Sequence, residues 1–232
     1  MNKAGQGVYS DMTPDEVSGL EAGLQWTKAP AGTRLIETGS RDTSVFLLAE
    51  GCARIARFAE SGREISYTDV VAPCFIGDLA AMTGDLRSVD VTLQAPARFA
   101  RLTAAGFSAL LQASPALALG HIRTLSILVR DLSDRVFTAI AYPLHDRLVI
   151  ELLRMARDAV QSEAASAVLD PAPSHYDIST RVGGHREAVT RALNSLARQG
   201  LVSLSRNRLA ILDLNRLRAL APVDARIEAG GN

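Results

Sequence analysis

Six glycines divide residues 32–102 into short runs in which polar and apolar side chains alternate. TRLIETG, VFLLAEG, ARIARFAE and VDVTLQA are four of these runs, and ESGR at residues 60–63 reads as a hairpin turn. Alternation with a period of two is typical of strands that bury one face, and regular glycine turns favour a closed β architecture. The segment therefore predicts an N-terminal β-roll of the double-stranded β-helix or jelly-roll type.

The chain becomes helical after residue 104, so strands and helices are segregated and the predicted fold class is α+β. A long helix is predicted over residues 116–141, ending before Pro143. Its apolar residues at near-heptad spacing are Leu125, Leu128, Leu132, Val136 and Ala139, with Val129 and Ile140 beside them. A coiled coil with a second copy would bury this stripe. Packing on the chain's own β-roll is the alternative; we favour the homodimer.

A helix-turn-helix pattern follows a second helix at 145–160 and a linker-like segment at 161–174. SHYDISTRV reads as a short helix, VGGH as a turn, and GGHREAVTRALNSLARQG as a second helix between glycines. At about 100° per residue, Arg186, Thr190, Glu187 and Arg191 share one face, opposite an apolar stripe. The stripe consists of Ala188, Val189, Ala192, Leu193 and Leu196. A second helix of this kind fits a DNA major groove, whereas a merely solvated face is the alternative.

Two further strands are predicted after Gly200, in LVSLSRNRLAILD. They are joined at Arg206-Asn207, so the motif is a winged helix-turn-helix in which Arg206 and Arg208 would meet phosphate groups. The segment 174–218 holds eight Arg and only three acids, although the formal net charge of the 232-residue chain is zero. Because Arg suits bidentate recognition of bases and phosphates, this local excess favours DNA as the partner.

The N-terminal residues MNKAGQGVYSDMTPDEV contain no apolar signal-peptide core. Thr13, Pro14 and Glu16 instead predict a capped helix over residues 13–25. No apolar run reaches the roughly 18 residues that a membrane helix needs. We therefore expect a cytoplasmic protein with no membrane partner.

The two cysteines, Cys52 and Cys74, lie 22 positions apart in the sequence. This spacing fits neither a zinc site nor a disulfide framework, and two cysteines cannot supply a cluster held by four. The sequence also contains no GxSxG or HExxH motif and no evident nucleophile–base pair, so we do not expect an enzyme.

The segment FIGDLAAMTGDLRSVDVTL, residues 75–93, predicts an anion site among the strands. A short helix starting at Asp78 would offer free backbone N–H groups, and Arg87 would offer a charge-assisted hydrogen bond to a phosphate. The Asp78 carboxylate only accepts hydrogen bonds, so it suits a sugar hydroxyl. An ion pair between Asp78 and Arg87 that closes the loop is the alternative.

At this point the chain resembles the Crp/Fnr family of bacterial transcription regulators. The family's nucleotide cassette runs Phe-Gly-Glu-Leu and then, about eight residues on, Arg followed by Ser, Ala or Thr. Here the cassette reads Ile76-Gly77-Asp78-Leu79 and then Arg87-Ser88. The resemblance implies a sensor β-roll at residues 1–115, a dimerisation helix and hinge at 116–142, and a DNA-binding domain at 143–232.

The resemblance also implies a cyclic nucleotide effector, cAMP or cGMP. The residues expected to bind it are Gly77, Asp78, Leu79, Ala80, Arg87, Ser88, Leu132 and Ser133. Asp78 would take the ribose 2′-hydroxyl, and Arg87 and Ser88 the cyclic phosphate. Asp78 replaces the family's Glu, and Leu132 stands where cAMP responders have Thr. A cyclic dinucleotide, or a ligand-independent regulator whose β-roll is only a dimerisation scaffold, therefore stays open.

The histidines lie at positions 121, 145, 175 and 185, all outside the predicted β-roll. Relatives that bind haem need a histidine near the cassette, so we expect no haem, as well as no metal and no iron–sulfur cluster.

The recognition motif of the family ends Ser/Thr-Arg-Glu-x-Val-x-Arg. Here it reads His185-Arg186-Glu187-Ala188-Val189-Thr190-Arg191, with His185 in place of the usual hydroxyl residue. The expected DNA-binding residues are His185, Arg186, Glu187, Thr190, Arg191, Arg206 and Arg208. The resemblance implies a homodimer on double-stranded DNA, with TGTGA-like half-sites in a palindrome and RNA polymerase as a further partner.

Overall fold

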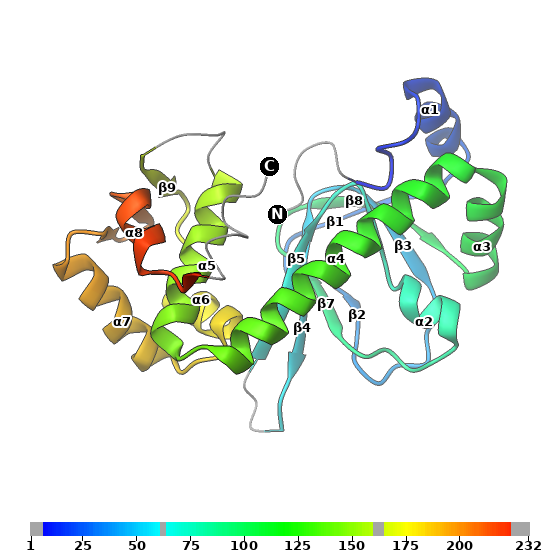
Figure 1. The fold of residues 1–232 in the computed structure, drawn as a ribbon. Coiled ribbons are helices and arrows are strands. Elements are labelled where there is room, and N and C mark those ends of the chain that lie inside the picture. Colours follow the sequence, from blue (N-terminus) through cyan, green and yellow to red (C-terminus); the bar gives the residue numbers. More distant parts are fainter. Residues whose placement is uncertain (1–6, 61–63, 160–164, 224–232) are drawn as a thin grey trace. The chain divides into compact units, whose positions relative to one another are not determined.

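The computed structural model describes residues 7–60, 64–159 and 165–223 (Figure 1). The chain divides into two compact units, and the division falls between Leu132 and Ser133, inside the long helix α4 (Pro115–Ala141). The domain bounds predicted from the sequence, 1–115, 116–142 and 143–232, stay a prediction.

The first unit contains two four-stranded antiparallel sheets, as predicted for a β-roll (Figure 1). One sheet has the order β1-β8-β3-β6, with β1 at Trp26–Ala29, β8 at Ala97–Leu102, β3 at Val45–Glu50 and β6 at Cys74–Ile76. The other has the order β2-β7-β4-β5, with β2 at Arg34–Ile36, β7 at Asp90–Leu93, β4 at Cys52–Phe58 and β5 at Glu64–Val71. Strands β4 and β5 pair from Cys52–Val71 to Phe58–Glu64. Residues 61–63 of the predicted ESGR turn lie outside the described residues.

Both sheets bury alternate side chains in a shared core, as the period of two predicts. Ile36, Phe46, Leu48, Leu93 and Phe99 are among its buried members. The Phe46 and Phe99 rings meet edge to face, with centroids 5.7 Å apart.

A second core lies between β3, β6 and the helices that cover them. Helix α1 (Pro14–Ala22) has the capping box that the sequence predicts, in which Thr13 and Glu16 bond each other's backbone N–H groups. Helix α3 (Ala104–Ala113) follows the roll, and α4 (Pro115–Ala141) follows α3. The fully or nearly fully buried residues of this core are Val8, Val45, Leu47, Phe75, Phe107 and Leu117.

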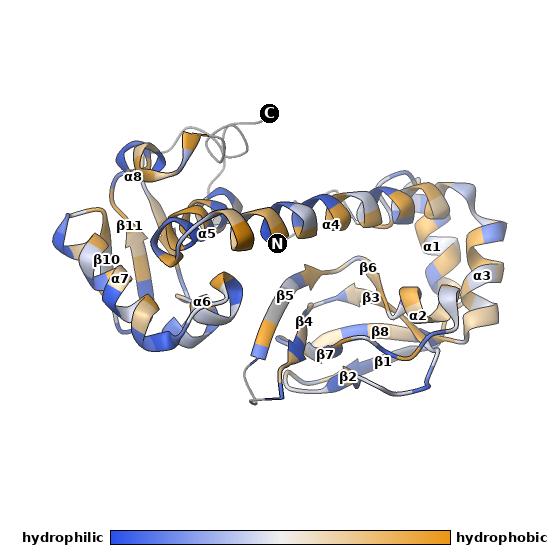
Figure 2. Cartoon of the chain, turned by 60° about the horizontal axis from the view of Figure 1, so that its bottom comes forward, coloured by the Kyte–Doolittle hydropathy of each residue, from blue (hydrophilic) through white to orange (hydrophobic). Residues whose placement is uncertain are grey.

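Helix α4 exposes part of the predicted apolar stripe, namely Val136 and Ala139, together with Val129 and Ile140 beside it. Figure 2 colours α4 by the hydropathy of its residues. Leu125, Leu128 and Leu132 are half-buried. The large apolar residues that α4 leaves exposed are Leu119, Ile122, Val129, Val136, Phe137 and Ile140. Leu119, Ile122, Ser126, Val129, Ser133, Val136 and Ile140 recur at spacings of three and four. These seven residues, called the α4 seam below, form a heptad stripe along one side of the helix.

The second unit is a winged helix-turn-helix, as predicted. Its helices are α5 (Leu144–Ala159), α6 (His175–Val182), α7 (Arg186–Arg198) and α8 (Leu214–Leu220). The wing strands β10 (Val202–Ser205) and β11 (Arg208–Ile211) are joined at Arg206-Asn207. The predicted linker at 161–174 is not all linker, because Ala167–Leu169 forms β9 and pairs with β11. The side chains of Leu148, Leu152, Ile178, Val189, Leu193, Leu196 and Leu209 anchor one core.

Candidate anion site and nucleic-acid interface

Arg87 is almost fully buried, with 4% of its surface exposed, at the end of the predicted cassette. Its Nη1 donates to the Gly77 carbonyl oxygen at 2.6 Å, and its Nη2 donates to the Ser44 carbonyl oxygen. Its Nε is buried and has no hydrogen-bond partner among the described residues. Burial lowers the pKa of the guanidinium, against the opposing effect of Asp42 and Asp78. Arg87 is thus a buried cation whose Nε–H is left without a partner and could donate to an anion.

The backbone fixes this arginine from both sides. Gly39 N–H donates to the Arg87 carbonyl at 2.8 Å, and Arg87 N–H donates to the Ser40 carbonyl at 3.0 Å. Gly77 has φ +86°, and a Cβ there would lie 2.7 Å from Arg87 Nη1 and 2.9 Å from the Ser44 oxygen. Only glycine fits this position, which explains its place before the short helix α2 (Asp78–Thr83).

A pocket of about 220 Å³ opens beside Arg87. Its lining residues are Arg34, Leu35, Ile36, Glu37, Ser40, Asp42 and Arg87. Arg34 is paired with Glu37 at 3.0 Å. Burial acts to raise the pKa of Asp42, but hydrogen bonds from Ser44 and the charges of Arg101 and Arg87 together lower it. The pocket therefore carries both signs of charge, and it is smaller than the roughly 300–1,000 Å³ of most small-molecule sites.

Asp78 does not face this pocket. Its Oδ2 lies 3.2 Å from Nε2 of His121 on α4, and both residues are buried. Within the described ranges Asp78 and Arg87 form no ion pair with each other, so the alternative of a loop-closing ion pair is not what the structure shows. Arg87 bonds backbone carbonyls instead.

His121 is a residue of this site that sequence reasoning missed. Its ring packs edge-on against Phe75 and Phe107, at centroid distances of 5.1 and 5.7 Å. His121 lies outside the strands of the β-roll, on α4, as predicted, but its side chain reaches Asp78 of the cassette. No local signal could have shown this contact, because Asp78 and His121 are 43 positions apart.

The other residues predicted to bind the effector differ in their exposure. Leu79 and Ser88 are exposed, whereas Ala80 is buried. Leu132, on α4, is half-buried at the end of the first unit, and Ser133 is exposed at the start of the second. Their roles in binding an effector stay predictions.

The turn between the two helices of the motif contains two glycines. Gly183 ends α6 with φ +63°, a backbone conformation that glycine adopts without strain. A Cβ on Gly184 would lie 2.6 Å from Leu144 Cδ1. Helix α7 then buries Val189, Leu193 and Leu196, as its apolar stripe predicts.

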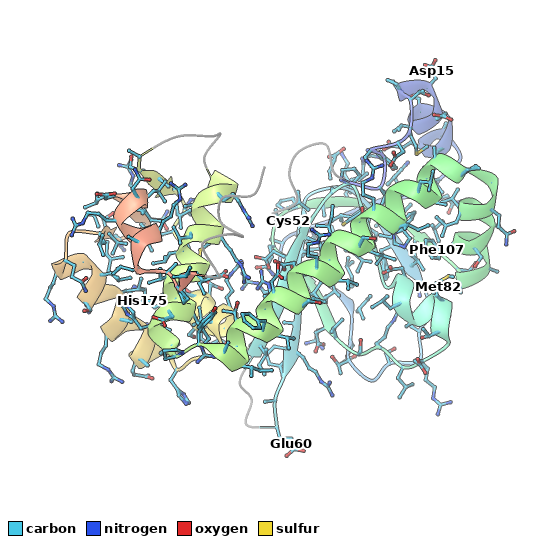
Figure 3. All side chains as sticks on the ribbon, in the orientation of Figure 1. Asp15, Cys52, Glu60, Met82, Phe107 and His175 are labelled. Atoms are coloured by element: carbon cyan, nitrogen blue, oxygen red, sulfur yellow. The ribbon has the colours of Figure 1, made fainter. Side chains whose placement is uncertain are left out.

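The predicted DNA-binding side chains lie mostly on the surface. Arg186, Glu187, Arg191, Arg206 and Arg208 are exposed. His185 stands at the N-cap of α7 and makes no side-chain cap bond. Thr190 is half-buried, because its hydroxyl bonds His175 Nδ1 at 2.9 Å; His175 begins α6 (Figure 3).

A buried acid joins the first helix of this unit to the motif. Glu151 on α5 is only 4% exposed. Its carboxylate lies 3.6 Å from Arg181 on α6 and 4.0 Å from Arg154. The contact with Arg181 links α6 to α5, and the Glu151 carboxylate is buried rather than exposed to solvent. We therefore assign Glu151 a structural role.

Two absences hold for the described part of the chain. Across residues 7–60, 64–159 and 165–223, no helix is long and apolar enough to cross a membrane. The same ranges contain no group of three or more His, Cys, Asp or Glu residues placed to hold a metal ion.

Each of the two units contains a segment that matches a known protein-family model. Residues 26–114 match the model of the cyclic nucleotide-binding domain, and residues 146–220 match that of the Crp-like helix-turn-helix domain. The CRP-like cAMP-activated global transcriptional regulator of Mycobacterium tuberculosis is 23% identical over 215 residues, covering 91% of this chain and 94% of the relative. The global nitrogen regulator of Synechococcus elongatus is 24% identical over 192 residues, covering 82% and 86%.

Solved structures share the fold. The c-di-GMP responsive global regulator CLP of Xanthomonas campestris has a TM-score of 0.76 at 18% identity, covering 86% of this chain and 99% of that one. A CRP/FNR-family transcriptional regulator from Thermus thermophilus has a TM-score of 0.69 at 22% identity, covering 85% and 98%.

A cyclic nucleotide-binding domain followed by a Crp-like DNA-binding domain defines a class of transcription regulators. The chain belongs to the Crp/Fnr family.

Proposed function

We propose that this protein is a homodimeric transcription regulator whose affinity for DNA is set by a cyclic nucleotide, cAMP or cGMP, bound in the β-roll. One observation carries the effector part. Arg87 is a buried cation that lines a pocket and keeps an unpartnered Nε. A buried donor without a partner is costly, and a phosphate oxygen would satisfy it.

The residues around Arg87 fit such a ligand in part. Arg87 can offer its unpartnered Nε–H, and Nη1 and Nη2 each carry a second N–H beside the one that bonds the Gly77 or Ser44 carbonyl. Ser88 is exposed next to it in the chain. Asp78 is held by His121, and the pocket has to widen before it admits a nucleotide. The proposal includes no haem, metal or iron–sulfur group.

The α4 seam supports the homodimer. Five of its seven residues are large and apolar, and all five are exposed. Pairing with the seam of a second copy would bury them, and the two serines at equivalent heptad positions would favour one register.

Exposed cationic and acidic side chains at the start of α7 support sequence-specific DNA binding. Arg186 and Arg191 can bond guanine edges, and Glu187 can accept from cytosine. A twofold dimer would read TGTGA-like half-sites in a palindrome, with RNA polymerase as a further partner. We place this activity in the cytoplasm, where bacterial DNA lies.

Calorimetry and DNA binding together test the proposal. The wild-type protein is titrated with cAMP, cGMP and cyclic di-GMP, and its affinity for a selected DNA site is measured by fluorescence anisotropy with and without each nucleotide. Arg87→Ala should lose nucleotide binding, and Arg87→Lys, which keeps the charge, should retain part of it. Arg57→Ala removes an exposed arginine of the same unit that does not line the pocket, so this matched control should bind nucleotide as the wild type does. A wild-type protein that binds DNA but none of the three nucleotides at millimolar concentration would establish the ligand-independent alternative instead.

A further inference from the structure

The contact between Asp78 and His121 joins the nucleotide cassette to α4. Asp78 is the first residue of α2, and His121 lies in the second turn of α4. Their side chains are 11% and 8% exposed, and Oδ2 and Nε2 are 3.2 Å apart. Asp78, the one acidic residue of α2, is therefore already in contact with another residue of the protein.

The His121 ring has little freedom to move away. Phe75 and Phe107 hold it edge-on from β6 and α3. The neighbouring Gly120 is so close to the N-terminal segment that a Cβ there would lie 2.2 Å from the Val8 carbonyl oxygen. Displacing the ring would disturb the packing of α4 on the β-roll. The Asp78–His121 contact therefore depends on the position of α4.

The two nitrogens of His121 also depend on this contact. Nδ1 is buried and has no hydrogen-bond partner among the described residues. Within those residues, the polar contact of the ring is therefore the one between Nε2 and Asp78. If Asp78 turned to a ligand, both buried nitrogens would lack partners, which costs free energy. Asp78 is also absent from the residues that line the pocket beside Arg87.

We propose that His121 is a positioning residue that competes with the sugar hydroxyl of a cyclic nucleotide for the Asp78 carboxylate. The inference rests on the proposed function, because it concerns the same site. A ligand hydroxyl can bond the Asp78 carboxylate only when His121 gives up its contact with that carboxylate. The free energy gained from the ligand hydroxyl is therefore largely cancelled by the loss of the His121 contact. The protein therefore gains little affinity from a 2′-hydroxyl, and binding through that hydroxyl loosens the tie between α2 and α4.

The experiment compares the dissociation constants of cAMP and 2′-deoxy-cAMP by calorimetry on the full chain. In the wild type we expect the two constants to differ by no more than about threefold. His121→Phe keeps an aromatic ring between Phe75 and Phe107 but removes the competing N–H. This variant should bind cAMP roughly tenfold more tightly than the wild type and leave 2′-deoxy-cAMP unchanged.

Three further variants separate competition from general damage. His121→Gln can still donate to Asp78 and should keep the wild-type ratio of the two constants. Asp78→Ala combined with His121→Phe should return the ratio to about one. Phe46→Leu disturbs the core between the sheets without touching His121, so it should lower the melting temperature and leave the ratio unchanged. If His121→Phe fails to fold, His121→Leu serves the same comparison.

The outcomes are distinct. A wild type that already rejects 2′-deoxy-cAMP tenfold, or a His121→Phe variant with the wild-type constants, overturns the competition while the effector proposal stands. A wild type and a His121→Phe variant that both bind neither nucleotide overturn the effector proposal and this inference together.

Discussion

Nδ1 of His175 on α6 lies 2.9 Å from the Thr190 hydroxyl oxygen on α7, and this hydrogen bond spans the two helices of the DNA-binding motif. The sequence predicts that Thr190 faces DNA, yet its side chain is half-buried because His175 holds it. The bond fixes the hydroxyl beside Arg186 and Arg191 on the exposed face of α7. Thr190 thus helps to orient the recognition helix on α6.

Thr190→Val should weaken binding to the selected DNA site by about 0.5 to 1.5 kcal/mol, the value of one neutral hydrogen bond. Valine keeps the shape of the side chain and removes only the hydroxyl. Affinity for a scrambled duplex should change less, because the lost contact orients base-reading side chains. Fluorescence anisotropy measures both. Ser195→Ala removes another hydroxyl from the same helix and should leave the two affinities unchanged; equal losses on both duplexes for Thr190→Val would contradict the assigned role.

Arg186→Ala and Arg206→Ala should affect DNA binding in different ways. Arg186 can bond a guanine edge, so its loss should relax the preference for one G·C pair by about 1 to 3 kcal/mol. Arg206, in the exposed turn between β10 and β11, should contact phosphate. Its loss should weaken binding to all sequences and reduce the salt dependence. Selection from a random duplex library checks both; unchanged selected bases for Arg186→Ala would remove α7 from sequence reading.

Glu151→Ala should lower the free energy of unfolding by about 3 to 5 kcal/mol, because it removes the carboxylate that lies between Arg154 and Arg181 in a buried setting. Glu187→Ala, which removes an exposed acid from α7, should change this free energy by less than about 0.5 kcal/mol. Urea unfolding measures both. Equal effects of the two substitutions would show that Glu151 is not structurally important.

Much of the fold was predictable from local sequence patterns. The capping box of Thr13 and Glu16, the alternation in the strands and the apolar stripe of α7 all depend on residues close together in the chain. β9 was missed because its three residues form a strand only through pairing with β11, some 40 positions further on.

The contacts that define the site were not predictable in the same way. Sequence reasoning identified Arg87 and Asp78 as chemically suited to a ligand, but their partners come from distant elements. Ser44 meets Arg87 across 43 positions, and His121 meets Asp78 across another 43. The α4 stripe was predicted only in part, because Leu125, Leu128 and Leu132 have the same heptad spacing as the exposed α4 seam but are half-buried. Only the packing of the helix decides which of the two stripes stays exposed.

Cys74 should not react with iodoacetamide at pH 8 in the folded protein. Burial, followed by the charge of Asp78, raises the pKa of its thiol from 9.0 to about 12, so the thiolate fraction falls roughly a thousandfold. Half-buried Cys52, whose pKa is also raised by burial, should react first. Mass spectrometry of the native and denatured protein checks this order. The folded thiol keeps its proton when the unfolded one ionises, so its contribution to stability is complete below pH 9 and declines as the pH rises above that value.

The α4 seam makes the sharpest prediction about assembly. Ile122 and Val129 are 58% and 62% exposed, whereas Leu128, in the stripe expected from the sequence, is half-buried. Ile122→Glu combined with Val129→Glu would place four like charges against one another in a paired seam, so the double variant should sediment as a monomer. It should fold normally, because neither side chain is part of the buried core. It should also lose most of its affinity for a palindromic site while it keeps weak binding to a half-site.

Arg130→Glu is the matched control for this experiment. Arg130 is exposed on the same helix but lies outside the seam. The same type of substitution there should leave the protein dimeric, which separates a specific interface from a general effect of negative charge on α4. Dimers that persist at micromolar concentration in the Ile122→Glu, Val129→Glu variant would show that the copies meet through another surface. In that case another partner would have to cover the α4 seam. Five large apolar side chains exposed at regular spacing on one helix are poorly explained as a solvated surface.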